Sequence, residues 1–193
     1  MAAAVEPTTQ PFLRPRSLDD EPDHAWLFPL LESIAPYSFF VLLRPTAPGL
    51  TAQTIQAALA SLQAHEWADS LRLITPWKGP HPGKMWRSQG KRIDGMMPVM
   101  EGLTAKGAPY HSSPTQSLPP VFRQTAGLEI GRELRCVRAG SLAGDRVMPF
   151  LVYGTHAIDL NVEADWAPAE AAIFAAETAR RATLDTHAIC CQP

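Results

Sequence analysis

"YSFFVLLRPTAPGLTAQTIQAALASLQAHEWADSLRLIT", residues 37–75, decides the fold of this chain. Its apolar run at 38–43 predicts a buried strand, which the prolines and glycine of 45–49 end. Thr51 is a suitable N-cap for a helix, whose apolar residues recur at helical spacing: Ile55, Leu59 and Leu62. A second strand, "LRLIT", follows at 71–75. The stretch therefore predicts a strand, helix, strand unit.

Elements on either side of this unit complete the prediction. "HAWLFPLLESI", residues 24–34, indicates a short or kinked helix because Pro29 interrupts it. Further strands are expected at "ELRCVR" (133–138), at its hairpin partner "RVMPFLVYG" (146–154) and at "IDLNV" (158–162). Pro149 places the second of these at a sheet edge or at a bulge. A final helix, capped by Asp165, is expected to turn four residues inward: Ile173, Phe174, Ala176 and Leu184.

The order of these elements predicts the α+β class, with two main helices packed on a mixed, largely antiparallel sheet. A ferredoxin-like variant is the nearest simple form. Residues 1–23 form a predicted disordered leader, residues 24–187 a single domain and residues 188–193 a flexible tail. Prolines and glycines recur so often over residues 76–127 that a long loop is expected there. A loop of this length in a compact domain is usually functional or disordered.

Composition limits the classes of protein to which the chain can belong. Of 193 residues, 46% are hydrophobic and 19% are charged, which is typical of a globular chain. No apolar run approaches the ~20 residues that a membrane-spanning helix needs. The cysteines are three in number and two of them, Cys190 and Cys191, are adjacent, which is no disulfide framework. We therefore expect a cytoplasmic protein without a membrane span.

Charge is unevenly distributed along the chain. The net charge is −2, yet residues 71–146 hold twelve basic and five acidic side chains. Residues 72–92 contain no carboxylate, and glycines there would let the backbone bend around a partner. This stretch gathers the predicted partner-binding residues: Arg72, Trp77, Lys78, Lys84, Trp86, Arg87, Lys91 and Arg92. Trp and Arg are the residue types that most often anchor recognition surfaces. The sequence thus predicts a non-enzymatic accessory protein, of inhibitor, immunity or adaptor type, that docks an acidic protein surface.

Three other interpretations of the same residues stay open. The first is a solvated loop whose charges only maintain solubility. The second is a small enzyme acting on an anionic substrate, with His111, His156 or Asp159 as acid or base. The third is binding of single-stranded nucleic acid, which a basic groove with stacking aromatics suits.

No cofactor or metal site is predicted. The six histidines lack the spacing of a zinc site. The segment from Gly79 to Lys84 is one residue too short for a nucleotide-binding P-loop, and Met85 stands where that loop needs Ser or Thr. Cys190 and Cys191 are interpreted as tolerated thiols near the end of the chain.

Overall fold

The computed structural model describes residues 22–34, 37–88 and 96–190 of the chain. The predicted leader therefore lies outside the described residues, except for its last two positions. The helices and strands are α1 (His24–Ser33), β1 (Phe39–Leu43), α2 (Ala52–Ala64), β2 (Ser70–Pro76), β3 (Trp86–Ser88), β4 (Met96–Pro98), β5 (Phe122–Arg132), α3 (Glu133–Ala139), β6 (Val147–Leu151) and α4 (Trp166–Cys190). None of the described helices has the length and apolar character that crossing a bilayer requires.

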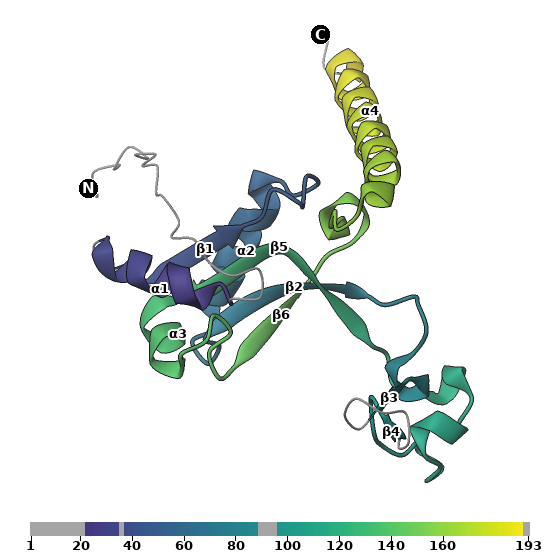
Figure 1. Ribbon diagram of the computed structural model, residues 1–193. Helices are drawn as coiled ribbons and strands as arrows, with labels where there is room; N and C mark the ends of the chain where they lie inside the picture. Colours follow the sequence, from purple (N-terminus) through teal and green to yellow (C-terminus); the bar gives the residue numbers. More distant parts are fainter. Residues whose placement is uncertain (1–21, 35–36, 89–95, 191–193) are drawn as a thin grey trace.

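A four-stranded sheet in the order β1-β5-β2-β6 forms the centre of the described structure (Figure 1). Strand β5 runs antiparallel to both of its neighbours, and β6 runs parallel to β2. The predicted α+β class with a mixed, largely antiparallel sheet is confirmed. The parallel β2–β6 pair distinguishes this sheet from an antiparallel ferredoxin-like one. A separate two-stranded sheet, β3–β4, lies where the β2 and β5 ribbon extends beyond the main sheet (Figure 1).

Helices cover both faces of the main sheet. On one face α2 contributes Ala58 and Leu62 to a core completed by sheet residues, among them Leu71, Leu73, Leu128, Ile130 and Met148. On the other face α1 and α3 surround Phe40 with a second core: Leu27, Leu31, Cys136 and Leu142. Successive side chains of a strand point to opposite faces, so β2 and β5 supply only alternate residues to the α2 core. Their other residues face α1 and α3.

The predicted elements before residue 76 are confirmed. Helix α1 contains Pro29, and the Thr51 side chain caps α2 by accepting a hydrogen bond from the Thr54 backbone N–H. Strand β1 differs from the prediction in burial, because it is an edge strand with Val41 and Leu43 exposed rather than a strand buried on both faces. Strand β6 is also an edge strand, as Pro149 indicated.

Several predictions beyond residue 76 were wrong. Strand β5 occupies residues 122–132, of which most were expected to be loop. "ELRCVR" is helix α3 rather than a strand, because the buried Glu133 and Cys136 are three residues apart and Gly140 ends the helix in the left-handed conformation. Strand β6 therefore has no hairpin partner there and pairs with β2. "IDLNV" forms no strand, and Phe174 is 72% exposed rather than inward.

A buried ion pair crosses the face of the sheet under α1. Arg72 of β2 lies directly opposite Glu129 of β5, and the Arg72 Nη1 forms an ion pair with the Glu129 Oε2. Both side chains are 9% exposed. Arg44 extends this network, because its Nη2 lies 3.2 Å from Glu129 Oε1 and also pairs with Asp23. Burial lowers the pKa of Arg72 from its usual value, and the Glu129 carboxylate opposes that shift.

We predict that Glu129→Gln lowers the free energy of unfolding by roughly 3–5 kcal/mol, because it leaves the buried Arg72 cation without its counter-charge. The double variant Arg72→Met/Glu129→Leu removes both charges and should regain most of that loss. Urea unfolding measures both, with Glu101→Gln at an exposed site as the control for a lost carboxylate. Equal stability of Glu129→Gln and the control would show that the pair contributes little.

Candidate functional site

The predicted partner-binding residues differ in their exposure. Arg72 is buried in the sheet, and Lys91 and Arg92 lie outside the described residues. Lys78 is exposed in the segment that follows β2, and Arg87 is exposed on β3. Among the described residues, Arg72 is therefore not part of an exposed basic surface, whereas Lys78 and Arg87 are exposed.

Several groups of the predicted surface are already engaged within the chain. The Lys84 Nζ donates to the His111 backbone carbonyl at 3.0 Å, and the Trp86 ring lies 5.1 Å from the His111 ring, centroid to centroid. The Trp77 Nε1 donates to the Pro80 carbonyl at 2.8 Å. These contacts hold the connections around β3 and β4 in place.

The three candidate acid or base residues lie in two separate segments of the chain. His111 lies in the 3₁₀-helix η2 (Tyr110–Ser112), where its Nδ1 is 3.0 Å from the Ser112 Oγ. His156 lies in η4 (Gly154–Ala157) beside α2, with its Nδ1 3.1 Å from the Thr54 Oγ1. Asp159 follows η4 and its Oδ1 is buried without a hydrogen-bond partner in the described part of the chain. In residues 22–34, 37–88 and 96–190, no hydrogen bond joins these three side chains.

An arginine pocket of about 440 Å³ lies at the end of the sheet where β2 and β6 begin. It is lined by Asp69, Arg135, Arg138, Ala139, Asp145 and Arg146. Arg135 and Arg138 are three residues apart on α3, which places their side chains on the same side of that helix. Arg146 directly precedes β6, and Asp69 directly precedes β2. Because β2 and β6 are parallel, their first residues lie side by side, which brings Asp69 and Arg146 together.

Asp69 organises this pocket. Its side chain is 7% exposed, and its Oδ2 accepts hydrogen bonds from the backbone N–H groups of Asp145 and Arg146, each at 3.0 Å. Its Oδ1 pairs with the Arg135 Nη1 at 3.2 Å and with the Arg146 Nη2 at 3.6 Å. Burial raises the pKa of Asp69, but the hydrogen bonds from Asp145, Arg135 and Arg146 outweigh it and leave the pKa below its ordinary value of 3.8. The carboxylate is therefore ionised at neutral pH.

Two glycines shape the loop that reaches Asp69. Gly140 and Gly144 both have a φ of +62°, the left-handed region that favours glycine. A Cβ on Gly140 would meet no atom within 4 Å, whereas one on Gly144 would lie 2.5 Å from the Asp69 Cβ. Because Gly144 lies so close to Asp69, the backbone N–H groups of the next two residues, Asp145 and Arg146, reach the Asp69 carboxylate. The sequence contains this signal in "AGSLAGD" (139–145), the stretch that connects the two strands predicted as a hairpin at 133–138 and 146–154.

The pocket carries more positive than negative charge. Three guanidinium groups face two carboxylates, those of the buried Asp69 and the exposed Asp145. Arg135 uses its Nη1 for Asp69 and for the backbone carbonyls of Glu66 and Ala68. Within the described residues, no carboxylate lies within ion-pair distance of Arg138. The arrangement can therefore accept an added negative charge.

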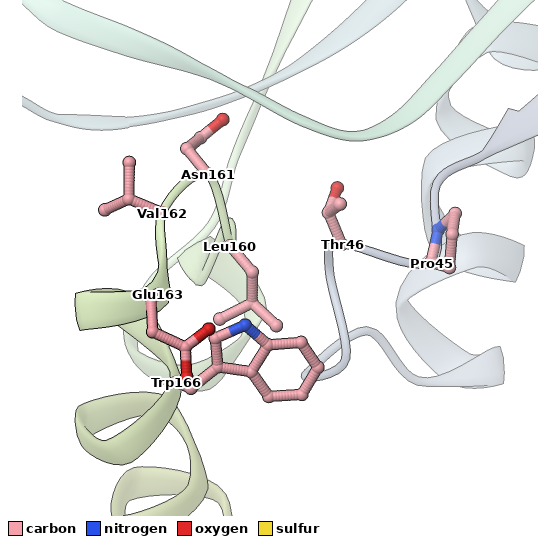
Figure 2. Close-up of a pocket in the computed structure, with 7 residues that line it drawn as sticks. All are labelled: Pro45, Thr46, Leu160, Asn161, Val162, Glu163 and Trp166. Carbon is pink, nitrogen blue, oxygen red and sulfur yellow. The ribbon is translucent and has the colours of Figure 1, made fainter.

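A separate groove runs between α4 and the connection from β1 to α2. Its first part, of about 360 Å³, is lined by Pro45, Thr46, Leu160, Asn161, Val162, Glu163 and Trp166. Figure 2 shows the Trp166 ring next to Leu160 and facing the segment that carries Pro45 and Thr46. The Leu160 backbone N–H donates to the Thr46 carbonyl at 2.8 Å and joins the two walls.

Comparisons with known proteins assign no family. No family model matches the chain, and no curated protein matches it. Among solved structures, one of CMP:2-keto-3-deoxy-manno-octonic acid synthetase complexed with CTP is similar at 10% identity and a TM-score of 0.47, over 83% of this chain and 70% of that chain. This degree of similarity assigns no activity, substrate or nucleotide to this chain.

The prediction of a non-enzymatic accessory protein docking through residues 72–92 was wrong. The structure removes Arg72 from the predicted surface, because that side chain is buried against Glu129. Sequence reasoning missed the arginine pocket because Asp69, Arg135 and Arg146 come together only through β2, α3 and β6.

We predict that Gly144→Ala destabilises the protein more than Gly140→Ala does. In both variants a non-glycine residue must adopt the left-handed conformation, which lowers the free energy of unfolding by roughly 1–2 kcal/mol. Only Gly144→Ala also forces Asp69 to move, because the new Cβ would lie too close to the Asp69 Cβ. Because the two positions share the same φ, Gly140→Ala is a matched control for the backbone effect. Thermal unfolding of the two variants measures the difference, and equal midpoints would contradict the close approach.

We predict that Asp69 makes the fold acid-sensitive. A carboxyl whose pKa is lowered by folding stabilises the folded state above its unfolded pKa, and that stabilisation is lost as the pH falls through the folded pKa. Between neutral pH and about pH 3, the free energy of unfolding should therefore fall more steeply for the wild type than for Asp69→Asn. Urea unfolding at a series of pH values measures both slopes, and parallel curves would contradict the assignment.

Proposed function

We propose that the chain binds a small oxyanionic ligand, one that carries a phosphate or carboxylate group, in the arginine pocket. The observation that carries this proposal is the convergence of Arg135, Arg138 and Arg146 on one pocket whose carboxylates do not balance them. A cytoplasmic location, inferred from cysteine usage, remains part of the proposal.

Guanidinium groups suit such a ligand. Their planar forks donate paired hydrogen bonds to carboxylate and phosphate oxygens, and these bonds are stronger than those between neutral groups. Arg138 is exposed, and within the described residues the Arg146 side chain has a single ion pair, the 3.6 Å contact with Asp69, so both side chains have donors to offer. Arg135, fixed by its three Nη1 contacts, would orient the ligand rather than move toward it.

Backbone hydrogen bonds also connect the elements that form the pocket. Asp69 lies between α2 and β2, and its own backbone N–H donates to the Arg146 carbonyl at 2.8 Å. The Arg132 backbone N–H in turn donates to the Asp69 carbonyl at 2.8 Å, which ties β5 and α3 to the same residue. A site whose supporting residues are fixed loses less entropy on binding.

A purely structural role for the arginines is the competing explanation. Arg138 lies in the last turn of α3, where a cation interacts favourably with the helix dipole. That explanation predicts a loss of stability on removal of Arg138 and no ligand binding by the intact protein. The two explanations thus differ in a measurable way.

We predict that Arg138→Ala weakens binding of an oxyanion by about tenfold, the effect of losing a charge-assisted hydrogen bond. Isothermal titration with inorganic phosphate, pyrophosphate and citrate measures it. Arg87→Ala is the matched control, because it removes an exposed arginine from β3 without touching the pocket. The absence of binding for all three probes, or equal affinity of the two variants, would refute the proposal.

A further inference from the structure

The groove beside α4 is longer than its first part. The cavity in Figure 2 shares Leu160 and Trp166 with a second one of about 350 Å³. The second shares Pro48, Ile173 and Glu177 with a third of about 490 Å³. The three cavities therefore adjoin one another along α4 from Trp166 to Arg180, and we call them together the α4 groove. Helix α4 projects away from the sheet (Figure 1).

The floor of this groove is apolar and exposed. Trp166 is 59% exposed and Phe174 is 72% exposed, and between them lies the half-buried Ile173. On the facing wall are Pro45 and Pro48. Large exposed apolar side chains that gather in one groove mark a surface that another segment covers.

The charged residues around the groove indicate which side chains a segment docked there would carry. The lining contains three carboxylates, those of Glu163, Glu170 and Glu177, against the single guanidinium of Arg180. Glu170 and Glu177 are exposed and flank Phe174 on the helix. A complementary segment would carry apolar side chains and positive charge, with no acid of its own.

The chain itself contains a segment with these properties. Residues 11–16, "PFLRPR", combine an aromatic and an aliphatic side chain with two arginines and two prolines, and residues 7–17 contain no acid. Proline-rich segments favour the extended polyproline conformation, which aromatic-lined grooves recognise at low entropic cost. Residues 11–16 lie outside the described part of the chain.

One ion pair connects the start of the described chain to the residue before the groove wall. Asp23 pairs with Arg44, and Arg44 directly precedes Pro45 of the groove wall. Arg16 precedes Asp23 by seven positions, which can span up to roughly 25 Å when extended. We propose that residues 11–16 dock into the α4 groove of the same chain, with Phe12 and Leu13 on its apolar floor and Arg14 beside Glu170 and Glu177.

Tryptic cleavage after Arg16 tests this docking in the full-length protein. Trypsin cuts the Arg16–Ser17 bond but not the Arg14–Pro15 bond. It can reach the Arg16–Ser17 bond only when residues 11–16 have left the groove. We expect this bond to be cleaved about tenfold more slowly in the protein than in a synthetic peptide of residues 8–21, because protection follows the population of the released form. Cleavage is followed by mass spectrometry of the fragment of residues 1–16.

Two variants make the test specific. Glu170→Lys/Glu177→Lys should bring the cleavage rate to that of the peptide, whereas Glu66→Lys/Glu101→Lys changes the net charge equally at exposed sites away from the groove and should keep protection. Arg14→Glu alters only the docking segment, so it should release the segment without affecting the folded domain. Wild-type cleavage at the rate of the peptide would overturn the proposal. Protection that rises with protein concentration would also overturn it, because the segment would then come from a second copy.

Discussion

Asp69 is the residue on which this structure depends most. Its backbone N–H, its carbonyl and both of its carboxylate oxygens are engaged within the protein. Through these contacts it joins the start of β2 to the end of β5, to α3 and to the loop before β6. A buried carboxylate is costly unless it is paired and hydrogen-bonded, so the fold must supply partners for it. It does so with two backbone N–H groups and the side chains of Arg135 and Arg146.

The position of the candidate site follows from that requirement. Partners for a buried carboxylate must reach it from elements that surround it, and here they come from α3 and from the residue before β6. The same elements also bring Arg138, which the carboxylate does not need. Arg138 therefore leaves an excess of positive charge at this end of the sheet. A ligand with an oxyanion would supply the negative charge that balances it.

Sequence reasoning predicted the elements whose apolar periodicity is complete and missed those whose pattern depends on distant partners. Helix α2 and strand β2 satisfy simple spacing rules. Strand β5, the strand that pairs with both β1 and β2, places the charged Glu129 between Leu128 and Ile130. That glutamate is buried only because Arg72, far away in the sequence, lies opposite. No local rule indicates such a pairing. The first part of the strand, residues 122–127, was expected to be loop because prolines and glycines recur over residues 76–127.

The same limitation explains why the site was expected elsewhere. A count of basic residues along the chain gave greatest weight to residues 72–92, where six of them occur without an acid. Arg72 belongs to that count by sequence and to a buried ion pair by structure. Arg135, Arg138 and Arg146 are interspersed with Glu133 and Asp145, so they form no basic stretch that is free of acids. In the fold, Glu133 is buried and its Oε2 accepts the Tyr37 backbone N–H at 3.0 Å. Its charge is therefore engaged away from the pocket and does not offset the three arginines there.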